Sequence, residues 1–181
     1  SFVLTKDEMQ CLDTARVMTG INIKYLMALL NSKFCEWVFA KFYAGGNLQG
    51  DTVRYKSTFL ENLPIPELSA ADQVPYEILV DCIQFARERG LDAEADTLEA
   101  VVDVMVYGLY FMEDMKAADC YINERIAESV RPFTDACDDA FKAAYVKKLA
   151  EFCKKDAVVY RGLIQSRNVG VVKTISGGKG V

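Results

Sequence analysis

The chain has 181 residues, of which 51% are hydrophobic and 26% are charged. These values are typical of a globular protein with a buried core and exclude an intrinsically disordered chain. The net charge is -5 and the pI is near 4.9, which argues against a protein that coats nucleic acid with a uniformly basic surface.

The charge is unevenly distributed along the chain. Residues 1–66 hold seven Lys or Arg against six Asp or Glu, residues 67–139 hold five against eighteen, and residues 140–181 hold nine against two. The middle of the chain is therefore strongly acidic and its end is basic. DNA should be repelled by the acidic part, so we expect that part to face another domain.

The first 66 residues predict a buried helix followed by a loop and a strand. Apolar residues recur with helical spacing from Asn22 to Val38, on more than one side of the helix. The glycine-rich stretch 45–50 should end this helix. Residues 53–56 alternate apolar and basic side chains, which predicts a short strand, and the two prolines of residues 63–66 then impose an extended path.

Residues 67–154 predict an acidic helical bundle. Helical stripes follow Pro75 and Asp92, and because Gly90 closes the first helix so near the second, these two helices should pack antiparallel. A third helix is predicted over residues 114–129, and a fourth begins near Pro132. Residues 155–181, by contrast, are rich in β-branched side chains and predict a basic, β-like tail.

The sequence offers no complete catalytic or metal site. Histidine is absent, which removes the commonest general base. The glycine-rich stretches 45–50 and 176–180 lack the following helix and the Lys-Ser or Lys-Thr ending of a phosphate-binding loop. The six cysteines lie at least sixteen residues apart, too far for paired zinc ligands. We therefore assign this chain no catalytic residue, metal or cofactor.

Cysteine usage and hydropathy predict a cytoplasmic location. Cys35, Cys82 and Cys137 fall within apolar helical stripes, where cysteine behaves as a small hydrophobe. No signal peptide opens the sequence and no apolar run is long enough to span a membrane, so we expect a reducing compartment and no membrane partner. The start at Ser1, without methionine, predicts that this is a C-terminal fragment of a longer protein.

Three ordered motifs carry a family resemblance. Leu-Leu-Asn-Ser-Lys at 29–33 precedes an aromatic-rich helix, the glycine loop and the Arg-Tyr-Lys strand; Asn-Leu-Pro-Ile-Pro follows at 62–66, and Asp103-x-x-Val-Tyr-x-Leu-Tyr at 103–110. This order resembles the C-terminal, TaqI-like specificity domain of Eco57I-type bifunctional restriction-modification enzymes and adenine-specific DNA methyltransferases. The motifs cover roughly residues 23–112.

The resemblance implies a fold and a function. It implies that residues 1–66 are the C-terminal part of a mixed α/β target-recognition domain, beside which the helical bundle of residues 67–154 packs. The fold class expected is thus mainly α with a small β component, ending in the tail of residues 155–181. The family's motifs for S-adenosylmethionine and for the target adenine do not occur here. The resemblance therefore implies that the methyltransferase domain and its S-adenosylmethionine lie upstream in the same polypeptide.

Candidate DNA contacts follow from the same stretch. Asn and Gln side chains can read adenine in the major groove, Arg and Lys can read guanine, and glycine lets a backbone approach a phosphate. We predict that Asn47, Gln49 and Arg54 read double-stranded DNA. Lys33, Lys41, Lys56 and Ser57 would position it through phosphate contacts.

Two interpretations of the whole chain remain open. The first is the DNA sequence-recognition fragment of a type II restriction-modification enzyme, non-catalytic on its own. The alternative is a helical interaction module that contacts another domain or subunit and does not touch DNA. The basic tail is compatible with both, since it could follow a phosphate backbone or dock against the acidic bundle.

Overall fold

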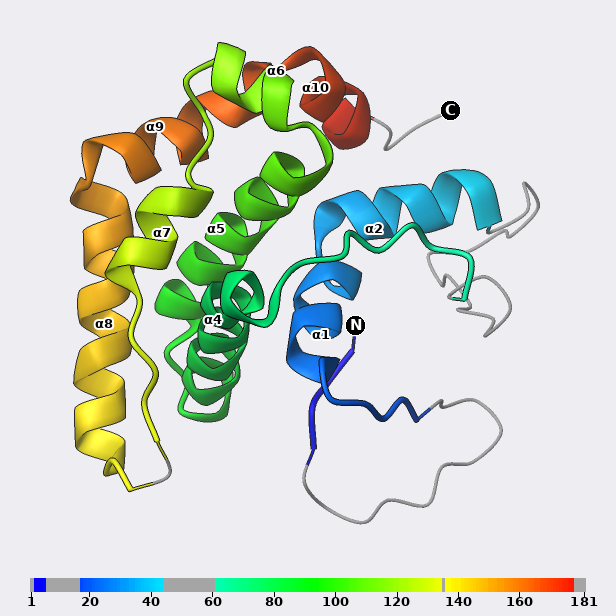
Figure 1. The fold of residues 1–181 in the computed structure, drawn as a ribbon. Helices are drawn as coiled ribbons and strands as arrows, with labels where there is room; N and C mark the ends of the chain where they lie inside the picture. Colours follow the sequence, from blue (N-terminus) through cyan, green and yellow to red (C-terminus); the bar gives the residue numbers. More distant parts are fainter. Residues whose placement is uncertain (1, 6–16, 44–60, 135, 178–181) are drawn as a thin grey trace.

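The computed structural model describes residues 2–5, 17–43, 61–134 and 136–177, which are mainly helical (Figure 1). The helices are α1 (Ile23–Leu30), α2 (Lys33–Val38), the π-helix η1 (Phe39–Tyr43), α4 (Ala70–Glu88), α5 (Asp92–Tyr110), α6 (Met112–Ala117), α7 (Asn123–Ser129), α8 (Asp139–Lys155), α9 (Ala157–Gln165), the 3-10 helix η2 (Ser166–Asn168) and α10 (Gly170–Gly177). The mainly α prediction is confirmed. The described ranges contain no strand, and the predicted strand at 53–56 lies outside them.

The predicted β-like tail is wrong in the described residues up to 177, because these residues form α9, η2 and α10. Asp156 caps α9 by accepting the N–H groups of Val158 and Val159 at 3.1 and 3.2 Å. In α10, Val172 and Ile175 are buried three residues apart. The preference of β-branched residues for strands is weak, and capping and burial outweigh it here.

The antiparallel pairing of α4 and α5 is confirmed. Gly90 has a φ of 69°, the left-handed conformation that ends a helix and favours glycine. Near the turn, Arg87 forms ion pairs with Asp92 and Asp96 at 3.1 and 2.6 Å. One pair of residues marks the opposite end of the hairpin: the Tyr76 hydroxyl lies 3.5 Å from the backbone oxygen of Met105.

Two of the predicted long helices are interrupted. The helix from Asn22 to Val38 breaks into α1 and α2, because the Ser32 side chain caps a new helix by accepting the N–H of Cys35. The helix predicted over 114–129 divides into α6 and α7. There Asp119 adopts a positive φ of 59°, and the Cys120 N–H returns to the backbone oxygen of Met115 at 2.8 Å.

A single hydrophobic cluster joins all three predicted segments. It contains buried residues of α1 and α2, of α4, α5 and α8, and of α9 and α10. Helix α5 lies among α4, α8 and α9 (Figure 1). Two ion pairs also connect the last segment to the bundle. Arg161 pairs with Asp119 of the bundle, and Asp156 pairs with Arg125 of the bundle. The domain boundaries at residues 66 and 154 stay a prediction.

Contacts of the Asn123 side chain fix the position of α7 on α5. The side-chain amide of Asn123 donates to the Tyr76 hydroxyl at 2.8 Å and to the backbone oxygen of Met105 at 2.9 Å. This places the Asn123 side chain over Gly108, so that a Cβ added at Gly108 would collide with the Asn123 amide oxygen. Gly108 is thus required by packing.

Gly108→Ala should lower the free energy of unfolding by about 1–3 kcal/mol, because the new methyl group overpacks the α5–α7 contact. A glycine-to-alanine change inside a helix normally stabilises, so the expected sign is opposite to the usual one. Urea unfolding measures it. Gly170→Ala is the matched control, since no atom lies within 4 Å of its added Cβ; equal stabilities for both variants would contradict the packing explanation.

Asp156→Ala should cost about 1 kcal/mol at neutral pH through loss of the α9 cap. The Arg125 guanidinium holds the pKa of Asp156 below its usual value, with Val158 and Val159 N–H contributing. A lowered folded-state pKa means that this stabilisation is present above the ordinary Asp value of about 3.9 and is lost as pH falls through the folded-state pKa. Urea unfolding of both proteins across this range tests it; a stability difference that is constant with pH would contradict it.

Candidate nucleic-acid interface

The N-terminus of α2 is joined to the middle of α5 by one carboxylate. Asp103, which is only 8% exposed, accepts the backbone N–H of Lys33 through Oδ1 at 2.8 Å. Its Oδ2 lies 3.0 Å from Lys33 Nζ. The first N–H groups of a helix have no partner within the helix, so a carboxylate placed there satisfies one of them and interacts favourably with the helix dipole.

Opposing influences act on the Asp103 carboxyl. Burial is the largest and raises its pKa, whereas the N–H and the ammonium group of Lys33 lower it. A buried carboxylate without such partners would carry a large desolvation cost. Burial outweighs these groups, so the pKa of Asp103 is raised overall, and Lys33 offsets part of the cost of burying the charge.

Aromatic side chains extend the contact from α2 to the proline motif. The Phe34 ring packs on Tyr110 with centroids 4.2 Å apart and meets Phe111 edge-on at 5.4 Å. The Tyr110 hydroxyl donates to the backbone oxygen of Pro64 at 2.8 Å. These groups connect α2, the end of α5 and the extended segment after residue 60.

A second tyrosine anchors the same extended segment. The Tyr25 hydroxyl on α1 donates to the backbone oxygen of Pro66 at 2.9 Å. Burial raises the pKa of Tyr25 to about 12 and also raises that of Tyr110. Both hydroxyls therefore remain protonated donors at neutral pH. Because proline carbonyls have no helical partner here, these two bonds fix the path of the chain.

The three sequence motifs thus meet in space. We call the set Lys33, Phe34, Pro64, Asp103 and Tyr110 the motif cluster. The chain leaves this cluster along α2 and η1 and returns to it at Pro64. The described segments on either side of residues 44–60 therefore belong to the same packed framework.

The structure describes two of the predicted DNA-contacting residues, Lys33 and Lys41. Lys33 belongs to the motif cluster, although its side chain is 65% exposed. Lys41 lies exposed in η1, and none of the described residues forms an ion pair with it. The remaining predicted contacts lie outside the described residues: Asn47, Gln49, Arg54, Lys56 and Ser57.

Sequence reasoning missed the residues that hold the framework. Asp103 and Tyr110 were visible only as members of the motif at 103–110, and Tyr25 only as one residue of the helix predicted from Asn22 to Val38. The Lys33–Asp103 contact joins positions seventy residues apart. The available signal was that Lys33 and Asp103 are each the one charged residue of their motifs, at 29–33 and 103–110.

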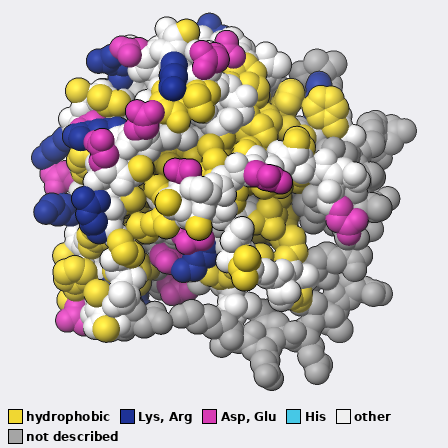
Figure 2. Space-filling model, in the orientation of Figure 1, with side chains coloured by type: hydrophobic (Ala, Val, Ile, Leu, Met, Phe, Trp, Pro, Cys, Tyr) yellow, Lys and Arg dark blue, Asp and Glu magenta, His cyan; other side chains and the backbone are white. Residues whose placement is uncertain are grey.

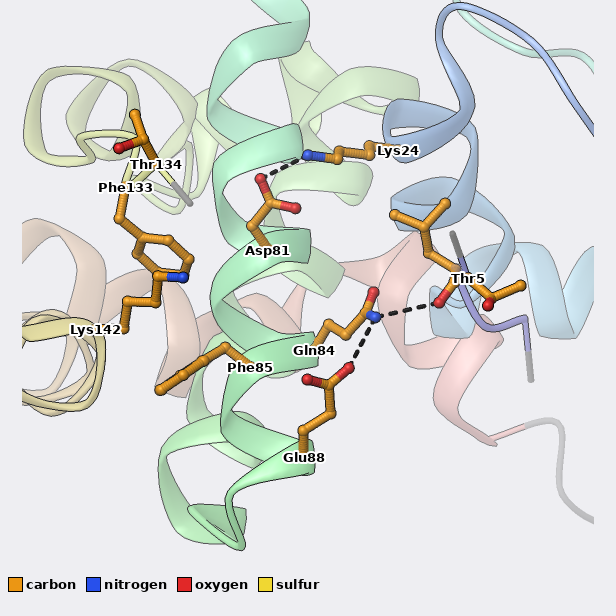
Figure 3. Close-up of a pocket in the computed structure, with 10 residues that line it drawn as sticks. Thr5, Lys24, Asp81, Gln84, Phe85, Glu88, Phe133, Thr134 and Lys142 are labelled. Carbon is orange, nitrogen blue, oxygen red and sulfur yellow. Dashed lines mark hydrogen bonds and ion pairs between the residues drawn. The ribbon is translucent and has the colours of Figure 1, made fainter. Parts of the chain in front are cut away.

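A groove of about 630 Å³ lies between residues 4–5, α1, α4, residues 133–134 and the start of α8 (Figure 3). Its charges are largely paired within the chain, because Lys24 Nζ lies 2.7 Å from Asp81 Oδ2 and Gln84 donates to Leu4 O and to Glu88. Among the described residues, no group of three or more His, Cys, Asp or Glu side chains is arranged to hold a metal. The groove therefore shows no assembled reaction centre.

The cysteines in the described ranges are free thiols. Burial raises the pKa of Cys35 to about 11 and those of Cys82 and Cys153 to about 12. Such thiols stay protonated at neutral pH and act as small core residues. In the same ranges, no helix has both the length and the apolar character needed to cross a membrane.

Comparison with known proteins finds no match: the chain matches no family model, no curated protein and no solved structure.

Asp103→Ala should reduce the free energy of unfolding by about 1–2 kcal/mol, since the Lys33 N–H loses its acceptor at a partly buried helix start. Lys33→Ala should cost less than about 1 kcal/mol, because it removes an exposed ammonium group but keeps the backbone N–H bond to Asp103. Urea unfolding of both variants measures this asymmetry. A larger loss for Lys33→Ala would show that the ion pair, and not the helix cap, holds α2.

Proposed function

We propose that this chain is the DNA sequence-recognition part of a type II restriction-modification enzyme, an adenine-specific DNA methyltransferase with or without a fused endonuclease. The observation that carries the proposal is the contact between the three motifs. The three motifs are far apart in sequence but pack together. The contacts that join them are Lys33–Asp103, Phe34–Tyr110 and Tyr110–Pro64. In this proposal, catalysis and S-adenosylmethionine belong to an upstream domain of the same polypeptide.

The residue types that this framework carries suit duplex DNA. Residues 44–60 contain Asn47, Gln49 and Arg54, whose amide and guanidinium groups match the edges of adenine and guanine in the major groove. Lys41, Lys56 and Ser57 flank them and supply phosphate contacts. A rigid framework under a polar loop is a frequent design for specific binding, because the loop then varies without unfolding the domain.

The ion-paired carboxylates around Arg87 do not oppose this arrangement. The Arg87 network, with Asp92, Asp96 and Glu99, lies at the start of α5, whereas Tyr110 is its last residue. Eighteen residues of helix separate Asp92 from Tyr110, which corresponds to about 27 Å. That distance exceeds the Debye length of about 8–10 Å at physiological salt, so these carboxylates act weakly on DNA near the motif cluster.

A helical interaction module without DNA contact is the second candidate, and an exposed apolar surface favours it. Figure 2 shows hydrophobic side chains gathered over the centre of one face. Apolar side chains also occur at the junction of α5 and α6, where Leu109 and Phe111 are partly buried and Met112 is 39% exposed. Contiguous apolar surface of this kind marks protein contacts. Sedimentation of this chain with and without the remaining polypeptide tests it, and a monomer that ignores the remainder would contradict it.

Arg54→Ala and Gln49→Ala in the full-length protein should weaken binding of the cognate duplex by about tenfold each and relax the sequence preference at one position. The physical reason is that each variant removes a base-edge hydrogen bond and leaves the phosphate contacts in place. Fluorescence anisotropy with the cognate duplex and single-base variants measures both effects.

Lys148→Ala is the control for this experiment. Lys148 is exposed on α8, which lies on the opposite side of the molecule from α2 (Figure 1). It should leave both affinity and sequence preference unchanged. If Arg54→Ala and Gln49→Ala modify and bind the same sites as the unaltered protein, residues 44–60 are not the reader and the proposal is wrong.

A further inference from the structure

Phe42 occupies a position that breaks the apolar pattern of its own helix. It is 68% exposed, whereas Val38 and Phe39, four and three residues earlier, are buried. In a regular α-helix, a residue three or four positions after two buried residues lies on the same buried face. The sequence pattern alone would therefore place Phe42 in the core.

The exposure of Phe42 coincides with a change of helix type. Residues Phe39–Tyr43 form a π-helix, whose wider turn rotates each later residue relative to the α-helical register. Phe39 remains fully buried and holds the turn on the core, while the ring of Phe42 is directed to the surface. Short π-helical turns are rare, and where they occur they frequently re-aim a side chain at a functional site.

The Phe42 ring is supported on one side. Trp37, which is partly buried and packs against the hydrophobic core, meets Phe42 edge-on with ring centroids 5.8 Å apart. An aromatic pair in this geometry is attractive beyond its buried area, so the ring of Phe42 is oriented before any partner arrives. Most of this apolar ring stays in water, and a partner that covers it gains the hydrophobic free energy of its burial.

A lysine precedes Phe42 in the same helical turn. Lys41 precedes Phe42 in η1 and is exposed, and no described residue forms an ion pair with it. An exposed aromatic ring and an exposed lysine at neighbouring positions supply the two kinds of group that a nucleic acid binds, one for the apolar face of a base and one for a phosphate.

We propose that Phe42 is a DNA-contacting residue that packs its ring against the base stack of the duplex, with Lys41 on the neighbouring phosphate. This inference rests on the function proposed above and adds a contact that reads no base edge. Its location supports it, because residue 44, only two positions later, begins the segment that carries the predicted base-reading side chains. Apolar side chains inserted between base steps act in this way in DNA-binding proteins that distort the duplex.

The test uses the full-length protein and a cognate duplex carrying 2-aminopurine at successive positions of the site. Phe42→Ala should weaken binding about tenfold and abolish the 2-aminopurine fluorescence change at the position where the ring packs. Phe42→Trp keeps a large aromatic ring and should retain both the affinity and the signal. Tyr160→Ala is the matched control, because Tyr160 is an exposed aromatic residue, 51% accessible, on α9, and it should change neither.

The outcomes separate this inference from the function on which it rests. If Phe42→Ala binds like the unaltered protein while Arg54→Ala is impaired, the Phe42 contact is wrong and the proposed function stands. If neither variant affects binding, the proposed function fails as well. A lower melting temperature for Phe42→Ala with unchanged DNA affinity would show that the ring is covered by another part of the protein, which also overturns the inference.

Discussion

The carboxylate of Asp103 is the contact on which the position of α2 depends. It accepts a hydrogen bond from the first N–H of α2, that of Lys33, and forms an ion pair with the ammonium group of the same residue. Asp103 lies in the middle of α5, among buried side chains of that helix. Helix α2 begins after its own cap, Ser32, and is only six residues long. A helix of this length is not stable through its own hydrogen bonds alone. The cap, the carboxylate and the Phe34–Tyr110 stack together give it a fixed direction. The π-helix η1, which follows α2 directly, starts from that direction.

Local rules predicted the elements whose signals are local. The α4–α5 hairpin follows from two clean apolar stripes and from Gly90, whose positive φ ends α4. The interruptions at Ser32 and Asp119 escaped prediction because apolar spacing continues through both, and what breaks the helices is a side-chain cap and a left-handed residue. The tail was assigned to strands because valine and isoleucine favour them, but Asp156 caps α9 and the core buries its inner side chains.

At the candidate site, too, the sequence indicated the local motifs but not the contacts between them. The motifs at 29–33, 62–66 and 103–110 were identifiable from sequence, yet their meeting was not, because the Lys33–Asp103 and Tyr110–Pro64 contacts join residues seventy and forty-six positions apart. Phe42 was hidden for a different reason. Its spacing from Val38 and Phe39 indicates a core residue, yet it is exposed within the π-helical turn Phe39–Tyr43. Places where a local pattern is broken at some cost are where function is expected.

The central claim is that the motif cluster holds a DNA-reading segment in place. Hydrogen-exchange mass spectrometry of the full-length protein, with and without a cognate duplex, tests it most directly, because exchange reports which backbone groups a ligand covers or stabilises. The account predicts that DNA slows exchange in residues 41–57 and leaves α8 (Asp139–Lys155) unchanged. Slowed exchange along α8 or at the α5–α6 junction, with none in residues 41–57, would contradict it.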